Sequence, residues 1–439
     1  MPPTRVRWTI ALLLLCITSV TYLDRLNIMV AATRIQDEFA LTEVQIGTIL
    51  SAFVLGYALF QIPGGILADA LGPRRLLGLA LFWWSVFTIL TALTADLPLT
   101  RWMGIAWAFI LVRFLVGVGE APALPGANKM IGLWMAPEER ALGNGIFIAG
   151  LGLGGALAPP LVVWLMETWG WRASFWVTGL LGFPLLMCWL MAVTDRPENH
   201  PRVNEAELAH IRGSRGTVES QTAPSSTPWR LVLSRADVWA LVGSYFLAGY
   251  TAYIFFTWSF LYIVNVRKLP VARAGFWTMA PFLAMAILSL VGGRVSDWTT
   301  RRWGKRWGRR LPVISGMSLA SLFLIVGSQT SHARLAIICL ALAAGLTGFA
   351  TVNWWATTVD LTRRFAGSLA GLMNTAGNLG GVASPTLTPY LAERFGWEMA
   401  LAVAAAAALL AGALWVFIHP DRPLEEAAMS TGAHHGGKR

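Results

Sequence analysis

Charged residues are scarce in this chain. Asp, Glu, Lys and Arg make up 13% of its 439 residues, whereas soluble domains carry roughly one quarter. Hydrophobic residues make up 56% of the chain, and its mean hydropathy is +0.58. This composition excludes an ordinary soluble domain and predicts a polytopic membrane protein.

Cysteine and histidine are also sparse. The three cysteines (Cys16, Cys188, Cys339) lie in apolar runs without metal-ligand spacing or an obvious disulfide framework, so we interpret them as packing residues and predict no metal site. The six histidines lie in predicted loops, in the tail or at the end of the last apolar run. None lies deep enough in a span to act with an intramembrane carboxylate, which argues against catalysis.

The net charge of +11 invites the idea of a nucleic-acid partner. Basic residues, however, collect in the cytoplasmic loops of membrane proteins, and we therefore predict no nucleic-acid binding.

Strand-like alternation of polar and apolar residues is missing as well. Apolar runs of about 20 residues recur from end to end, and each is long enough to cross a bilayer as a helix. Because lipid admits only helices or closed barrels, these runs predict an all-α membrane protein with twelve transmembrane helices. The predicted spans are residues 8–33, 44–69, 74–94, 102–130, 141–167, 172–194, 236–264, 273–297, 311–329, 333–358, 366–392 and 397–418.

One long polar stretch, residues 195–235, divides the spans into two groups of six. We predict an N-terminal six-helix bundle over 1–194, a cytoplasmic linker over 195–235, a C-terminal six-helix bundle over 236–422 and a cytoplasmic tail over 423–439. Most Lys and Arg fall in segments that are inside if both termini are cytoplasmic, which is the expected bias. The first apolar run is longer than a signal core, so we predict a retained first helix.

The two halves repeat each other at nearly one offset. Three pairs of segments, 226 to 228 residues apart, carry this repeat: Gly65–Asp69 with Gly293–Asp297, Gly154–Pro159 with Gly380–Pro385, and Gly170–Trp171 with Gly396–Trp397. The chain is therefore predicted to form two pseudo-symmetric bundles. Such repeats place a binding site at their interface near mid-membrane, with access alternating as the bundles rock.

Two pairs of charged residues lie inside apolar runs: Asp24 with Arg25, and Arg113 with Glu120. Ionised groups are costly in hydrocarbon, so such residues usually mark an ion or substrate path. Arg113 and Glu120 are seven positions apart, which puts both on one helical face, and we predict that this face lines a cavity. Burial favours the neutral carboxyl and a neighbouring cation favours the ionised one, which suits Glu120 to proton exchange. A permanent structural ion pair is the alternative.

Asp24 and Arg25 are adjacent and so point about 100° apart on one helix. We predict that Asp24 pairs with Arg113 and is the second protonation site. Arg25 is then available to hold an anion, because its planar guanidinium matches a carboxylate. The alternative is that Arg25 only neutralises Asp24.

Polar side chains in otherwise apolar spans complete the candidate pocket, since they have donors and acceptors for the hydroxyl groups of a polyol acid. An intramembrane Asn forms hydrogen bonds between helices about as often as it contacts a ligand, so both roles stay open for each Asn. These residues are Tyr22, Asn27, Tyr57, Gln61, Asn353, Asn374 and Asn378. The aromatic residues of span seven, Tyr250, Tyr253, Phe256 and Trp258, line the site or only pack.

The chain resembles the major facilitator superfamily over nearly its whole length. The superfamily signature is Gly65-Ile-Leu-Ala-Asp69-Ala-Leu-Gly72-Pro-Arg74-Arg75. Within the superfamily, the chain resembles the anion:cation symporter family of hexuronate and galactonate transporters, sialin and the vesicular glutamate transporters. The segments that carry this closer resemblance are Tyr22–Asn27, Tyr57–Gly65, Arg113–Pro122 and Gly371–Gly381.

The resemblance implies roles for individual residues. It implies that Arg113 and Glu120 take part in proton coupling, and that Tyr22, Tyr57, Thr351, Trp354 and Asn374 fall where related sugar-acid carriers contact substrate. It also implies an inner conformational latch at Asp69, Arg74 and Arg75, with Asp297, Arg301 and Arg302 as its copy, joined by the segment Pro137–Arg140. The simpler interpretation of the basic residues is positive-inside loop charge.

The sequence thus predicts a proton-coupled symporter of a small organic anion that works by alternating access. We expect a sugar acid of the hexonate, hexuronate or glucarate type, with protons as the coupling ion and no other cofactor. We also expect a monomer in the lipid bilayer of a bacterial inner membrane. Alternatives are a carrier or exchanger of an aromatic or dicarboxylic acid and, more remotely, a membrane sensor or enzyme, for which no output domain or catalytic constellation is evident.

Overall fold

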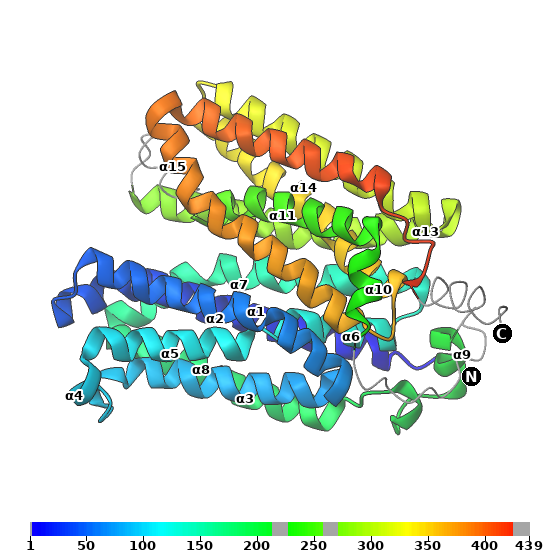
Figure 1. The fold of residues 1–439 in the computed structure, drawn as a ribbon. Helices are drawn as coiled ribbons and strands as arrows, with labels where there is room; N and C mark the ends of the chain where they lie inside the picture. Colours follow the sequence, from blue (N-terminus) through cyan, green and yellow to red (C-terminus); the bar gives the residue numbers. More distant parts are fainter. Residues whose placement is uncertain (1, 213–226, 258–270, 425–439) are drawn as a thin grey trace, which may run out of the picture.

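The computed structural model describes residues 2–212, 227–257 and 271–424, and they fold almost entirely into helices (Figure 1). Two bundles of long helices lie one above the other in Figure 1. The lower bundle comes from the first half of the chain and the upper bundle from the second, as the colours show.

The first bundle contains six spans. The helices of this bundle are α1 (Val6–Phe39), α2 (Glu43–Leu71), α3 (Pro73–Ala92), the short α4 (Thr100–Met103), α5 (Ile105–Glu120), α6 (Ala123–Trp134), α7 (Arg140–Trp169) and α8 (Trp171–Ala192). The 3₁₀ turns η1 (Thr94–Asp96) and η2 (Pro137–Glu139) join them. A capping box of Thr42 and Gln45 starts α2, and Pro73 at the first helical position starts α3. The fourth span consists of α5 and α6, and it is interrupted at Pro122, just after Glu120.

The second bundle contains α11 (Ala236–Thr257), α13 (Val271–Gln329), α14 (Ala333–Leu361) and α15 (Ala366–Ala413), followed by the turn η5 (Leu414–Phe417). Two of these helices are interrupted by a glycine with positive φ, Gly304 at 74° and Gly396 at 85°. A side chain is disfavoured at such angles, so glycine lets each helix turn back and form two limbs. Figure 1 shows α15 turning back in this way.

In the part of the chain that the structure describes, ten helices are long and apolar enough to cross a membrane. Because α13 and α15 each contribute two limbs, a helix or limb corresponds to each of the twelve predicted spans. The prediction of an all-α membrane fold is therefore confirmed. The outer end of the seventh predicted span, including Trp258, lies outside the described residues.

The segment between the bundles forms the 3₁₀ turn η3 (Pro197–Asn199) and two short helices, α9 (Glu205–Arg212) and α10 (Trp229–Ser234). The buried carboxylate of Glu207 on α9 lies 2.9 Å from Arg7, which also pairs with Glu139 at 2.9 Å. These ion pairs attach α9 to the first turn of α1 and to η2. The linker is thus packed against the first bundle at this end.

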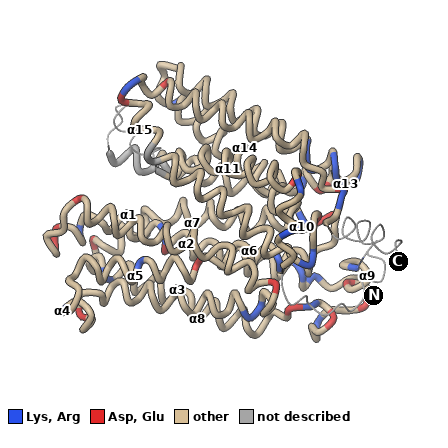
Figure 2. The backbone as a smooth tube through the Cα atoms, viewed as in Figure 1, with Lys and Arg blue, Asp and Glu red and all other residues tan. Residues whose placement is uncertain are grey.

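The bundles approach each other most closely at the end where α1 begins and where the described chain ends after η5, and we call this end the terminal face (Figure 1). Figure 2 shows that Lys and Arg gather at this same end. The hydrogen bonds and ion pairs that join the bundles lie mainly there, for example those of Asp69 with Ser368 and of Arg140 with Asp360. The described conformation is therefore closed at the terminal face.

Candidate functional site

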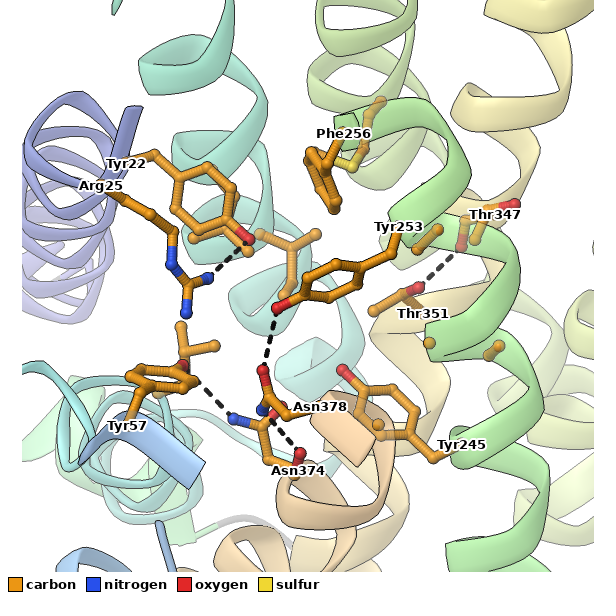
Figure 3. A pocket seen from close by; sticks show the side chains of 18 residues that line it. Tyr22, Arg25, Tyr57, Tyr245, Tyr253, Phe256, Thr347, Thr351, Asn374 and Asn378 are labelled. Atoms are coloured by element: carbon orange, nitrogen blue, oxygen red, sulfur yellow. Dashed lines mark hydrogen bonds between the residues drawn. The ribbon is translucent and has the colours of Figure 1, made fainter. Parts of the chain in front are cut away.

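A cavity lies between the two bundles, about halfway along the spans. About 660 Å³ of space free of protein atoms belongs to it, including the part that is open to solvent. Helices α1, α2, α6 and α7 line it on one side, and α11, α13, α14 and α15 on the other (Figure 3). This is the position at which a repeat of two bundles is expected to hold a ligand.

The guanidinium of Arg25 is the only charged group on the described wall of this cavity. Its carbon lies 4.4 Å from the ring centre of Tyr57, 4.9 Å from that of Phe53 and 5.3 Å from that of Tyr22. These aromatic faces hold the cation by cation–π attraction and leave its edge open. One amino group, Nη2, has no hydrogen-bond partner among the described residues, and Nη1 makes only a long bond of 3.4 Å to the Tyr22 hydroxyl.

Polar groups face Arg25 from the second bundle (Figure 3). Asn374 donates to the Tyr57 hydroxyl at 3.4 Å and to Gln61 Oε1 at 2.9 Å, which links α15 to α2. The Tyr253 hydroxyl donates to Asn378 Oδ1 at 3.0 Å. These bonds fix the orientation of the amides, and a buried amide left unpaired would be costly. The result is a rigid polar wall opposite the guanidinium.

The rest of the cavity wall is largely apolar. Phe256 packs against Tyr22 and Phe282, with ring centres 5.7 and 5.4 Å apart. The hydroxyls of Thr347 and Thr351 donate to backbone oxygens of their own helix, α14. This side therefore offers shape and apolar surface rather than free donors.

Six predicted pocket residues line the cavity: Tyr22, Arg25, Tyr57, Thr351, Asn374 and Asn378. Gln61 lies one hydrogen bond behind the wall. Trp354 is fully buried and packs on Trp415 with its indole donating to Ser244, so it lies outside the cavity. Asn27 and Asn353 are also buried outside it, bonded to Thr178 and Ser296 respectively.

Span seven contributes a residue that the sequence analysis missed. Tyr245 lines the cavity together with Tyr253 and Phe256, whereas Tyr250 packs inside the second bundle and bonds to Thr388. Positions 245, 253 and 256 follow each other at intervals of 8 and 3 residues along α11, and these intervals keep side chains on one side of a helix. This spacing was the signal for a common face.

The buried charges Asp24, Arg113 and Glu120 lie inside the first bundle, behind the cavity. All three side chains are fully buried and none belongs to the cavity wall, so the prediction that the Arg113 and Glu120 face lines the cavity is wrong for this conformation. The covering helices explain this, because α2 and α3 pack directly on α5. The predicted contact between Asp24 and Arg113 is also not made, since no hydrogen bond or ion pair joins the two side chains among the described residues.

These charges act on one another at longer range. The charge of Arg25 acts on Glu120, and so do those of Asp24 and Arg113. The ring of Phe53 lies beside both Arg25 and Arg113, at 4.9 and 5.1 Å from their guanidinium carbons. Because electrostatic interactions are weakly screened in a buried site, the cavity and the buried acids are electrostatically connected through Arg25.

At the terminal face, two aspartates bind the first turns of helices in the opposite bundle. Asp69 accepts from the backbone N–H groups of Gly367 and Ser368, at 3.1 and 2.8 Å. Asp297 accepts from those of Ala141 and Leu142, at 3.0 and 2.8 Å. A carboxylate at a helix N-terminus satisfies unpaired donors and the helix dipole. The two contacts are related by the same repeat offset that the sequence shows.

The predicted arginine members of these contacts lie elsewhere. Arg74 donates to Leu190 and Asp195 within the first bundle, and Arg75 is exposed. Arg301 and Arg302 are also exposed. The contacts of Asp69 and Asp297 instead include Lys129, at 2.9 Å, and Arg309, at 3.1 Å.

A second buried cluster joins the bundles at this face, and the sequence analysis recognised only part of it. Asp360 at the end of α14 pairs with Arg140 at 2.8 Å and with Arg309 at 3.1 Å. All three side chains are fully buried. Arg140 belongs to the segment that the sequence assigned to the inner layer, whereas no local pattern singles out Asp360 or Arg309.

We expect Asp360→Asn to destabilise the protein strongly. The change leaves the buried guanidinium of Arg140 without its carboxylate and leaves Arg309 with Asp297 alone, which costs about 3 kcal/mol or more. Asp421→Asn, an exposed aspartate near the same face, is the control and should change stability by less than about 0.5 kcal/mol. Thermal unfolding followed by tryptophan fluorescence compares the variants, and equal melting temperatures would contradict the role of this cluster.

Comparisons with known proteins agree with this architecture. Residues 14–385 match the family described as Major Facilitator Superfamily, and a second match to this family covers residues 301–434. Similar curated proteins include a probable galactarate/D-glucarate transporter of Bacillus subtilis, which is 32% identical over 90% of this chain and 87% of its own length. A D-galactonate transporter of Escherichia coli is 31% identical over 95% of this chain and 97% of its own. A probable sulfoacetate transporter of Cupriavidus necator is 31% identical over 93% and 94%.

Solved structures show the same fold. A proton:xylose symporter of the superfamily matches with a TM-score of 0.75 and 14% identity, covering 96% of this chain and 98% of that structure. A human organic anion transporter matches with a TM-score of 0.70 and 16% identity, covering 94% and 100%. With the family match and the curated relatives, these findings lead to one conclusion: this chain belongs to the Major Facilitator Superfamily and is a multi-pass membrane transporter, not an enzyme.

Proposed function

We propose that the protein is a proton-coupled symporter of a small organic anion, a sugar acid of the hexonate, hexuronate or glucarate type. The observation that carries this proposal is the guanidinium of Arg25 in the central cavity, with an amino group left unpaired. A carboxylate fits the planar edge of that group with two parallel hydrogen bonds. The names of the relatives from Bacillus subtilis and Escherichia coli support a sugar acid.

The hydroxyl groups of such a substrate need polar partners. Tyr22, Tyr57 and the amides of Asn374 and Asn378 border the space in front of Arg25 (Figure 3). Hydroxyl and amide groups both donate and accept, so this wall suits a chain of hydroxyls next to the carboxylate.

Coupling to protons follows from the buried acids. Asp24 and Glu120 are enclosed in the first bundle, where an ionised carboxylate without close partners is costly. When Glu120 is ionised, its negative charge offsets part of the positive charge of Arg25 and weakens the attraction of Arg25 for an anion. Protonation of Glu120 removes this effect, so the anion binds more tightly to the protonated carrier. Neutral acids also lower the cost of closing the cavity around the substrate.

Alternating access uses the contacts at the terminal face. With both termini in the cytoplasm, as the concentration of Lys and Arg at that face supports (Figure 2), the described conformation is closed to the inside. Substrate and protons then enter from outside, the bundles rock, and the contacts of Asp69 and Asp297 break to release the cargo inward. These contacts serve as the inner latch. A bacterial inner membrane and a monomeric carrier complete the proposal.

Uptake into proteoliposomes tests the proposed function. We expect labelled D-glucarate or D-galactonate to accumulate when the outside is acidic, and a protonophore to abolish the accumulation. Uptake that is indifferent to the pH gradient would contradict proton coupling.

A second candidate substrate is an aromatic acid, either symported or exchanged. The apolar wall formed by Phe256, Phe282 and Met285 favours it, because a ring would bury apolar surface there. Ligands that bind only the folded state raise its melting temperature. A larger shift with hydroxybenzoate than with D-glucarate or D-galactonate would favour the aromatic acid over the sugar acid.

A further inference from the structure

The turn between the two limbs of α13 carries an unusual surface. It contains six basic residues within ten positions: Arg301, Arg302, Lys305, Arg306, Arg309 and Arg310. The last two are buried, and Arg309 is held by Asp297 and Asp360. The other four point outward or lie half-buried at the terminal face. Figure 2 shows this concentration of positive charge at the turn of α13.

Three indoles alternate with these cations. Trp298, Trp303 and Trp307 are 53%, 49% and 52% exposed, and Trp298 and Trp303 pack edge to face with their ring centres 5.6 Å apart. Exposed tryptophans at the end of a transmembrane helix sit at the depth of lipid headgroups. The cations between them therefore lie at the depth of the lipid phosphates.

The positive charge of this turn is not neutralised by the protein. Among the described residues, no hydrogen-bond or ion-pair partner exists for the side chains of Arg301 and Arg302. Arg306 has only a 3.5 Å contact with His419, and Lys305 lies 3.6 Å from Asp360, which two arginines already engage. A surface of this kind attracts anions from its surroundings.

The equivalent turn of the first repeat differs. It joins α2 to α3 and carries Arg74 and Arg75. The first bundle itself holds this turn, since Asp195 accepts from the Arg74 backbone N–H at 2.8 Å and the Arg74 side chain donates to Leu190 at 2.7 Å. Both repeats contribute contacts that close the bundles at this face. These contacts therefore do not explain why the turn of the second repeat alone carries additional cations and indoles.

We propose that the α13 turn, formed by Trp298, Arg301, Arg302, Trp303, Arg306 and Trp307, binds the phosphodiester headgroup of an anionic phospholipid. The guanidinium groups contact phosphate oxygens as charge-assisted donors, and the indoles lie in the interface beside them. Charge complementarity favours this occupant, because clusters of Lys and Arg next to a transmembrane helix attract anionic lipids. The lipid would contact the same segment that supplies Asp297 and Arg309 to the contacts between bundles.

The test uses the full chain, purified in detergent and freed of lipid. Phosphatidylglycerol, phosphatidylcholine and inorganic phosphate are titrated separately, with lipid adducts counted by native mass spectrometry and melting followed by tryptophan fluorescence. We expect phosphatidylglycerol to bind and stabilise the protein, phosphatidylcholine to bind more weakly, and inorganic phosphate to leave the melting temperature unchanged. High salt should weaken the phosphatidylglycerol effect.

The triple variant Arg301→Gln, Arg302→Gln, Arg306→Gln identifies the site. Each basic side chain at an anionic surface contributes roughly fivefold to binding, so the half-saturating concentration of phosphatidylglycerol should rise at least about tenfold. Arg196→Gln with Arg202→Gln, two exposed arginines of the linker, is the matched control and should bind like wild type.

Wild-type binding of phosphatidylglycerol by the triple variant would overturn the proposal, as would equal stabilisation by inorganic phosphate or by phosphatidylcholine. If the lipid-free triple variant melts below wild type, the single variant Arg302→Gln replaces it, with about a fivefold loss expected. Absence of that loss would equally overturn the proposal.

Discussion

Replacing Arg25 with alanine is expected to weaken substrate binding about a hundredfold or more and to abolish uptake. A carboxylate at this guanidinium makes two charge-assisted hydrogen bonds, each contributing about 1.5 kcal/mol or more. No other charged group on the described cavity wall can replace it. Isothermal titration calorimetry of the purified transporter with D-galactonate or D-glucarate measures the loss.

Two further variants make this test specific. Arg25→Lys keeps the charge but loses the planar fork and its contacts with Phe53 and Tyr57, so we expect an intermediate loss of about tenfold. Arg294→Ala removes an arginine that is exposed on α13 and outside the cavity, and it should bind substrate like wild type. Unchanged affinity in Arg25→Ala would remove the basis for an anionic substrate.

Replacing Glu120 with glutamine is expected to make substrate binding independent of pH. In the wild type, the proton and the anion favour each other's binding, so affinity should be highest at low pH and fall as the pH rises. One coupled proton gives up to about a tenfold change per pH unit. The glutamine resembles the protonated acid, so affinity should stay near the low-pH value of the wild type at every pH.

Exchange of substrate across the membrane should survive in Glu120→Gln, because a neutral side chain still permits the loaded carrier to reorient. Glu167→Gln, at the exposed end of α7, is the matched control and should keep the pH dependence of the wild type. A Glu120→Gln variant whose affinity still falls with pH would place the coupling on another group, with Asp24 the next candidate.

The sequence predicted the helices and their repeat well because both depend on patterns that are local or simply periodic. Apolar runs set the spans, and glycines with positive φ, such as Gly304 and Gly396, set the turns within α13 and α15. Asp69 and Asp297 occupy equivalent positions of the repeat, and their partners do too: Asp69 binds the start of α15, and Asp297 binds the start of α7.

The partners of those aspartates were harder to predict. Asp69 and Asp297 bind backbone N–H groups at helix N-termini. Because nearly every residue has such a group, the residue types do not indicate which one is the partner. The nearby arginines were therefore assigned a role that Lys129 and Arg309 have instead. Asp360 and its two arginines come from three distant segments, so only the fold brings them together.

Side-chain direction limited the prediction of the cavity. Thr351 and Trp354 are three residues apart on α14, yet Thr351 faces the cavity and Trp354 turns toward Trp415. In the same way, Arg25 points into the cavity, whereas its neighbour Asp24 points into the first bundle. The sequence showed that these two differ in direction, but the packing of α1 against α7 and α8 decides which direction leads to the cavity.

Accumulation against a concentration gradient tests the central claim most directly, namely that a buried acid must bind a proton before the loaded carrier reorients. In proteoliposomes with an acidic exterior, wild type should concentrate D-galactonate or D-glucarate inside, while Glu120→Gln should only equilibrate the substrate. Accumulation by Glu120→Gln to the wild-type level would contradict the claim.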